Sequence, residues 1–150
     1  MGVSLIKHAS DEVKKDILTK VVQDGLRLCF AIEESNHHDP VKISCEAKKD
    51  GSNFIISGEK SFVIDGGFAD KVIVACRTSG EKGSKDGLSL FALDSDSKGL
   101  TITPTKMVDS RNAANMKFEN VKVSSDMLIG KEDDAYEIIE SVLDISRAAI

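Results

Sequence analysis

Strand-like hydrophobic patterns run from Leu26 to about Gly130, and this long stretch constrains the fold more than any other feature of the sequence. Lys71 to Cys76 is an almost unbroken apolar run, which is typical of a strand covered on both faces, and Leu88 to Leu93 is similar. Val41 to Ala47 alternates apolar and polar residues, which predicts a strand with one buried face. The middle of the chain is therefore expected to be β structure.

Turn signals divide the rest of this stretch into shorter strands. Lys49-Asp50-Gly51-Ser52 is a hairpin signal. Thr78 to Gly87 is rich in Gly, Ser and charged residues and is interpreted as a solvated loop. Because it lacks the spacing GxxxxGKS/T and no helix follows, a phosphate cradle is disfavoured there. Further strands are expected at Asn53–Ser57, Lys60–Ile64, Leu100–Thr105, Ala113–Phe118 and Val121–Val123.

Two amphipathic helices flank the β region. Ser10 precedes acidic and apolar residues at helical spacing and Gly25 ends the pattern, which predicts a helix of roughly 13 residues. After Asp133, acidic residues lead into a second apolar pattern with helical spacing that runs to Ile150. Since no stop signal follows, we expect Ile150 to lie inside a helix of a longer protein.

Composition excludes several classes of protein. The net charge is −5 and aromatic residues make up 5% of the chain, so the basic face and the stacked rings that nucleic-acid binding needs are not expected. No apolar run approaches the ~18 residues of a membrane span, and the N-terminus lacks the apolar core of a secretory signal. Cys29, Cys45 and Cys76 lie far apart in apolar or alternating stretches, which predicts reduced core residues in a cytosol-like compartment.

His37, His38 and Asp39 form a cluster with metal-ligand chemistry. Adjacent histidines on an extended chain point to opposite faces and no third ligand is suitably spaced, which favours a polar loop over a metal site. Glu33 and Glu34 diverge in the same way, so at most one of them faces a given site. The motifs GxSxG, HExxH and GxGxxG are absent from the sequence. The residues by themselves therefore assign no catalytic role and no metal.

Several segments nevertheless follow a known order. Cys29 to Asp39 (CFAIEESNHHD) occupies the place of the pattern Y/F-A-L-T-E-P-x-A-G-S-D/N. Gly58 to Gly66 (GEKSFVIDG) occupies that of G-x-K-x-W/F-I-T-N-A/G, and Asp109-Ser110-Arg111 and Phe118 to Val123 come next. In the order and spacing of these segments, the chain from about Asp11 to Ile150 resembles the acyl-CoA dehydrogenase family.

This resemblance implies a mainly β fold, a barrel-like pair of antiparallel sheets flanked by an N-terminal and a C-terminal helix. It divides the chain into the end of an N-terminal helical domain (1–27), a middle β domain (28–130) and the start of a C-terminal helical domain (131–150). In the family, the glutamate that abstracts the α-proton comes from that C-terminal domain, beyond this sequence. We therefore expect the 150 residues to be inactive on their own.

The resemblance also implies FAD as cofactor and the oxidation of an acyl-CoA thioester to the 2,3-enoyl-CoA. The cofactor-binding residues it implies are Phe30, Ile32, Glu33, Phe62, Val63 and Ile64, and the substrate-binding residues are His38 and Asp39. Family members usually carry flavin-bonding hydroxyls at the positions of Glu33 and Ile64, and often Trp at Phe62. Phe62 can still stack on a ring, whereas Glu33 would bring a negative charge near it.

The partners implied by the resemblance are an acyl-CoA substrate, an electron-transfer flavoprotein and further copies of the parent protein. The implied compartment is the bacterial cytoplasm or the mitochondrial matrix. The departures at Glu33 and Ile64 leave open a redox-inactive homologue that acts as a binding or scaffold domain. An unrelated, free-standing β-barrel binding module is disfavoured by the missing stop signal at Ile150.

Overall fold

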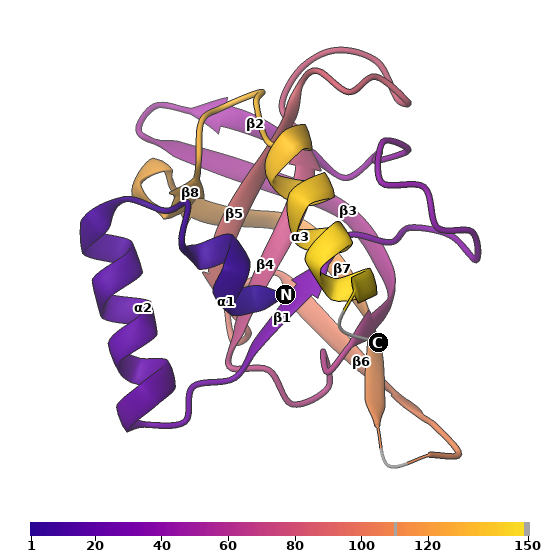
Figure 1. The fold of residues 1–150 in the computed structure, drawn as a ribbon. Coiled ribbons are helices and arrows are strands. Elements are labelled where there is room, and N and C mark those ends of the chain that lie inside the picture. Colours follow the sequence, from indigo (N-terminus) through magenta and orange to yellow (C-terminus); the bar gives the residue numbers. More distant parts are fainter. Residues whose placement is uncertain (110, 149–150) are drawn as a thin grey trace.

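The β region forms one open sheet in the computed structural model, which describes residues 1–109 and 111–148 (Figure 1). Within these residues, eight strands pair in the order β6-β7-β3-β2-β4-β5-β8, and β1 lies beside β4. The strands are β1 Leu28–Ala31, β2 Glu46–Asp50, β3 Asn53–Ile64, β4 Lys71–Arg77, β5 Leu88–Asp94, β6 Leu100–Lys106, β7 Asn112–Ser124 and β8 Leu128–Ile129.

Two antiparallel groups of strands make up this sheet. One group is β6, β7, β3 and β2, and the other is β4, β5 and β8. A single parallel pair, Glu46 with Arg77, joins β2 to β4, and β1 runs parallel to β4 along its length. The predicted mainly β fold between two helices is confirmed, although the sheet is mixed and does not close into a barrel.

The hydrophobic core is centred on β4 and β5. Every residue of β4 is buried, as are the first six residues of β5. Continuous burial requires cover on both faces of a strand. Helices lie over one face of the sheet (Figure 1), and Phe54 of β3 packs its ring against Phe91 of β5 with 4.8 Å between the ring centroids.

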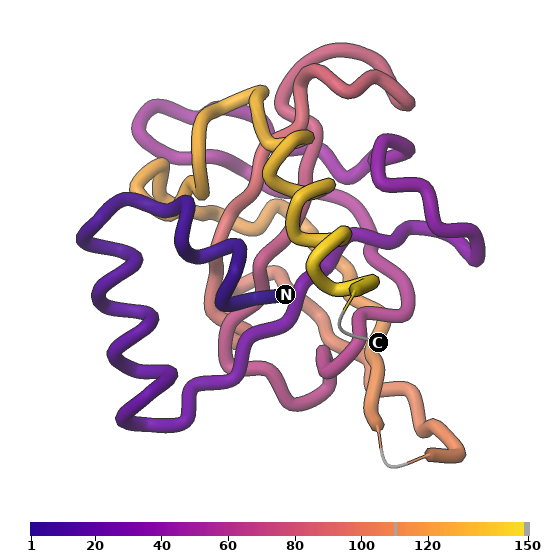
Figure 2. Tube along the Cα trace, viewed as in Figure 1, coloured from indigo at the N-terminus to yellow at the C-terminus, as the bar shows by residue number. Residues whose placement is uncertain are grey.

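Both predicted helices form, and a third α-helix joins them among the described residues. The three are α1 Gly2–Ile6, α2 Asp11–Gln23 and α3 Tyr136–Ala148. The Ser10 hydroxyl caps α2 by accepting from the N–H of Val13. The tube in Figure 2 shows the N-terminal residues approaching α3. The short α1 was not expected, because five residues are too few to show a helical period.

The expected continuation of the second helix to Ile150 lies partly outside the described residues, as does Ser110 of the family-like segment 109–111. None of the described helices has the length and apolar character needed to cross a membrane.

Residues 41–45 do not join a strand, so the prediction of a strand over Val41 to Ala47 is wrong for its first five residues. Ile43 and Cys45 are buried and their neighbours are largely exposed, as the alternation predicted. Side chains bond much of the backbone of this segment, and β4 contributes one bond, from the N–H of Arg77 to the carbonyl oxygen of Cys45. The side chain of Arg77 donates to two carbonyl oxygens of the segment, and Glu34 accepts from two of its N–H groups.

Two pairs of expected short strands are each one long strand. Residues 53–57 and 60–64 both belong to β3, and residues 113–118 and 121–123 both belong to β7. The pairing of β3 with β7 shifts register between Ile56 and Gly58 and again between Lys60 and Val63. Such irregularities reset the alternation of side chains, so the sequence pattern looks interrupted where the strand is continuous.

Candidate functional site

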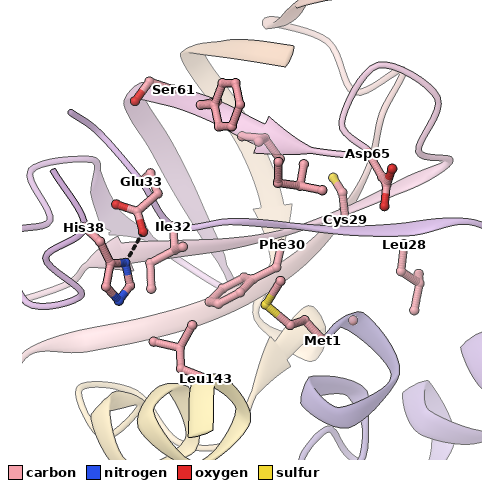
Figure 3. A pocket seen from close by; sticks show the side chains of 14 residues that line it. Met1, Leu28, Cys29, Phe30, Ile32, Glu33, His38, Ser61, Asp65 and Leu143 are labelled. Atoms are coloured by element: carbon pink, nitrogen blue, oxygen red, sulfur yellow. Dashed lines mark hydrogen bonds and ion pairs between the residues drawn. The ribbon is translucent and has the colours of Figure 1, made fainter. Parts of the chain in front are cut away.

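A pocket of about 250 Å³ opens where β1 and β3 meet α1 and α3 (Figure 3). Its lining residues are Met1, Gly2, Leu28, Cys29, Phe30, Ile32, Glu33, His38, Ser61, Phe62, Val63, Ile64, Asp65 and Leu143. Figure 3 shows Phe30 facing Met1 and Leu143, which close one side of the pocket. Glu33 and Asp65 lie toward its two ends, so an apolar interior is bounded by two carboxyl groups.

Phe62 lies on the irregular part of β3. Its φ of +49° falls in the left-handed region, which an aromatic residue rarely adopts. Its N–H donates to Oδ1 of Asn115 at 3.0 Å, and this bond to β7 helps to hold the conformation. The residue is 51% exposed and lines the pocket. The strand thus presents a large ring to the pocket rather than to the core.

Ser61 brings an unpartnered hydroxyl to the same pocket. Its Oγ is buried and has no hydrogen-bond partner among the described residues. Its N–H donates to the carbonyl oxygen of Glu33 at 2.8 Å, which ties β3 to the segment after β1. A buried hydroxyl without a partner costs free energy, so a ligand that bonded this group would offset that cost.

Glu33, His38 and Arg147 form a chain of polar contacts at the edge of the pocket. Oε1 of Glu33 bonds Nδ1 of His38 (Figure 3), and Nη2 of Arg147 lies 3.2 Å from Nε2 of His38. A guanidinium can only donate, so Nε2 accepts and Nδ1 carries the proton that is donated to Glu33. This arrangement needs a neutral His38, and it leaves the charge of Glu33 at the pocket.

Glu34 instead pairs with Lys60, whose side chain is fully buried. Nζ of Lys60 lies 2.8 Å from Oε1 of Glu34 and also donates to the carbonyl oxygen of Ile32 at 3.1 Å. Burial raises the pKa of Glu34, but the Lys60 charge and two backbone N–H donors outweigh it, so the pKa lies below its usual value. The pair fixes the segment that carries Glu33 against β3.

The buried guanidinium of Arg77 holds the next part of this segment in place. Burial lowers the pKa of Arg77, whose hydrogen bonds all go to neutral carbonyl groups. The acceptors are the carbonyl oxygens of Val41, Ile43, Ser79, Ser84 and Asp86. The loop from Thr78 to Gly87 is therefore anchored to residues 41–43, and its glycines belong to an ordered loop.

The structure brings together seven of the eight residues that the resemblance singled out. The seven that line the pocket are Phe30, Ile32, Glu33, His38, Phe62, Val63 and Ile64. Asp39 lies elsewhere, since its carboxylate accepts from the N–H of Val41 at 3.4 Å and lies 3.7 Å from Nζ of Lys42. In the part of the chain that the structure describes, no cluster of residues could hold a metal ion.

Seven lining residues were missed by the sequence reasoning, and they are Met1, Gly2, Leu28, Cys29, Ser61, Asp65 and Leu143. Ser61 and Asp65 flank the predicted stretch Phe62 to Ile64, and the glycines after Asp65 signal a turn that could have marked it. Met1 precedes α1 and Leu143 belongs to α3, and these helices pack on the sheet although they are far from β1 and β3 in sequence. No local pattern reports such docking.

Comparison with protein families matches residues 29–121 to the family described as "Acyl-CoA dehydrogenase, middle domain". The curated acyl-CoA dehydrogenase FadE29 of Mycobacterium tuberculosis is 28% identical over 100% of this chain, which covers 39% of that relative. FadE12 of the same species is 33% identical over 89% of the chain, which covers 35% of that relative. The chain thus spans less than two fifths of the length of these relatives.

A solved structure shows the same fold. The acyl-CoA dehydrogenase from Geobacillus kaustophilus superposes with a TM-score of 0.88 at 28% sequence identity. The superposition covers 96% of this chain and 38% of the other. The similarity therefore includes the flanking helices as well as the β region.

Proposed function

Since the chain belongs to the acyl-CoA dehydrogenase family, an oxidoreductase family, we propose that it supplies part of an enzyme that oxidises an acyl-CoA thioester to the 2,3-enoyl-CoA. Residues 28–130 would form the middle domain, between the ends of two helical domains at 1–27 and 131–150. Its part in the enzyme would be the surface that covers the flavin and a share of the acyl-CoA site. The observation that carries this proposal is the convergence of seven implied residues on one pocket.

The pocket suits the ring system of a flavin rather than a whole FAD. About 250 Å³ is below the usual volume of a site for a complete small ligand, but apolar walls with a few polar groups are the usual surroundings of a flat ring. The unpartnered hydroxyl of Ser61 can bond a ring oxygen or nitrogen. When bound, a flavin would supply the two-electron oxidation of the substrate.

The chain's own residues would hold and shield that ring. Phe62 offers an aromatic face, and Val63 and Ile64 extend the apolar wall. Phe30 and Ile32 line the β1 side and exclude water. We place the acyl-CoA near His38 and Asp39, although only His38 lines the pocket itself.

The reaction also needs a base within hydrogen-bond reach of the substrate α-proton. No residue of the described pocket is implied in that role, so we propose that the 150 residues alone do not oxidise acyl-CoA. We further propose an electron-transfer flavoprotein as electron acceptor and a homo-oligomeric parent. The mycobacterial origin of the relatives named above supports the bacterial cytoplasm rather than the mitochondrial matrix as its compartment.

Glu33 favours a second candidate, a redox-inactive homologue that binds or scaffolds. An ionised carboxylate can only accept hydrogen bonds, and its charge opposes the negative charge that a reduced flavin can carry. His38 bonds this carboxylate through Nδ1, and its Nε2 lies against Arg147. The two candidates differ in whether acyl-CoA reduces a bound flavin.

The full product of the gene that encodes this chain tests the proposal. It is expected to purify yellow after incubation with excess FAD and to lose that colour when an acyl-CoA is added without oxygen. Phe62→Ala should weaken FAD binding roughly tenfold through lost ring contact. Phe68→Ala is the matched control, because Phe68 is 63% exposed and lies outside the pocket.

A colourless product at saturating FAD, or equal effects of the two phenylalanine variants, would contradict the proposed flavin site. A yellow product whose flavin no acyl-CoA reduces would instead support the redox-inactive homologue.

A further inference from the structure

Cys45 and Cys76 lie side by side in the core although they are 31 positions apart in the sequence. Their sulfur atoms are 3.8 Å apart, and both thiols are free and buried. The residues that follow them, Glu46 and Arg77, form the parallel pair between β2 and β4, and the N–H of Arg77 donates to the carbonyl oxygen of Cys45 at 2.7 Å. The two cysteines therefore occupy matching positions on adjacent segments, so their side chains point to the same side.

We propose that Cys45 and Cys76 form a dithiol that a small disulfide, such as glutathione disulfide, oxidises to an intrachain disulfide. In the first step the Cys45 thiolate attacks the small disulfide, forming a mixed disulfide and releasing one thiolate. In the second step Cys76 gives up its proton and its sulfur attacks the Cys45 sulfur, which releases the second thiolate. The protein loses two electrons and two protons, and the small disulfide becomes two thiols.

The surroundings make Cys45 the attacking sulfur. The hydrogen bond from the Cys76 thiol, together with the charge of Lys60, lowers the pKa of Cys45 and outweighs the opposing effect of burial. Burial raises the pKa of Cys76, so Cys76 stays protonated until the mixed disulfide has formed. Cys29 provides the contrast within the same chain, because burial raises its pKa to about 12 and it has no thiol neighbour among the described contacts.

Cys45 is 1% exposed, so a reagent reaches its sulfur only when the surrounding segment opens locally. It lines a surface pocket of about 320 Å³ together with Lys42, Ser44, Gly58 and Lys82. A Cβ atom at Gly58 would lie 2.9 Å from Sγ of Cys45, so only a glycine lets the β3 backbone pack this closely against the sulfur. The segment 41–45 is outside the strands and is held largely by side chains, with one backbone bond to β4 between Cys45 and Arg77. Local opening there breaks that one bond to the sheet as well as the bonds to side chains.

Closing the disulfide brings the sulfur atoms from 3.8 Å to about 2 Å. This movement draws Cys45 toward β4 and strains the bond between its N–H and Glu34, which follows Glu33 of the first pocket. The proposed oxidation depends on the short distance between the two sulfur atoms and is independent of the proposed flavin function.

The native 150-residue protein can be incubated with glutathione disulfide, then unfolded in denaturant so that buried thiols react, alkylated with iodoacetamide and measured by mass spectrometry. The number of alkylated cysteines should fall from three to one, and non-reducing peptide maps should join the Cys45 and Cys76 peptides. In the Cys76→Ser variant the reaction should stop at a glutathione adduct on Cys45. In the Cys45→Ser variant no glutathione adduct should form on Cys76. Cys29→Ser should cross-link as the unmutated protein does.

Three alkylated cysteines after incubation of the native protein with glutathione disulfide, under conditions that do oxidise the unfolded chain, would overturn the proposal. Glutathione on Cys29 at the rate seen for Cys45 would overturn it equally. The main readout uses the unmutated protein, so a variant that fails to fold does not decide the result.

Discussion

Lys60 keeps a charged side chain fully buried, which is possible because its ammonium group has fixed partners. It donates to the carbonyl oxygen of Ile32 and pairs with Glu34. These bonds lock β3 to the segment after β1. Because those two parts of the chain carry half of the pocket lining, the pair stabilises the site as well as the fold.

Lys60→Met is therefore expected to destabilise the protein by about 3–5 kcal/mol, because it leaves the Glu34 carboxylate without its counter-charge. Lys117→Met is the matched control, since Lys117 pairs with Glu119 on the exposed face of β7. Urea unfolding followed by circular dichroism measures both variants. Equal destabilisation by the two substitutions would contradict the role given to the buried pair.

Glu34 should make the protein sensitive to acid. Its pKa in the folded protein lies below the ordinary value of 4.5, so its stabilising contribution is complete above that value and is lost as the pH falls through the lowered pKa. Glu34→Gln is expected to flatten the fall of the unfolding free energy on the acid side. Glu46→Gln removes an exposed carboxylate and should leave the slope unchanged, so a similar slope change in both variants would count against the interpretation.

Glu33 should lower the reduction potential of a flavin bound in the pocket. Glu33→Gln keeps the shape of the side chain and an acceptor for His38 but removes the negative charge beside the ring. We expect the potential to rise in this variant, as measured by dye-coupled spectroscopic titration. Asp39→Asn removes a nearby charge that does not line the pocket and should change the potential much less.

At the scale of the elements, local sequence signals correctly predicted the helices and strands that local contacts stabilise. The cap at Ser10 and the stop at Gly25 bracket α2, and the apolar run of β4 reported its burial. Residues 41–45 show where such reasoning fails. Their alternation predicted burial, but their backbone partners are Glu34 and Arg77, which no local pattern links to them.

Arg77→Lys tests how this segment is held. Lysine has three N–H donors where arginine has five, so at least two of the carbonyl groups lose their donor, at about 1–3 kcal/mol for each buried group. Amide hydrogen exchange should speed up across residues 41–45 and the loop Thr78–Gly87. The exposed pair of Arg27 with Asp70 provides the control Arg27→Lys, for which exchange in these two segments should stay unchanged.

At the scale of the whole molecule, the family resemblance identified most of the β-sheet side of the pocket but not its other side. Phe62 to Ile64 could be found because they lie in one recognisable segment. Met1 and Leu143 could not, because α1 and α3 reach the pocket only through packing on the sheet. The hydroxyl of Ser61 lacks a partner because tertiary packing buries it, and a serine within a strand pattern gives no sequence signal of such burial.

The central claim, that this pocket faces a flavin, is tested most directly by NMR titration of the 150-residue protein with FAD, since shifts report even weak binding. The account predicts that amide shifts concentrate at residues 30–33 and 61–64 and disappear when Phe62 is replaced by alanine. Residues around Phe68, which lies outside this pocket, should stay unchanged. Shifts that gather around Phe68, or a pocket that does not respond to FAD, would contradict the account.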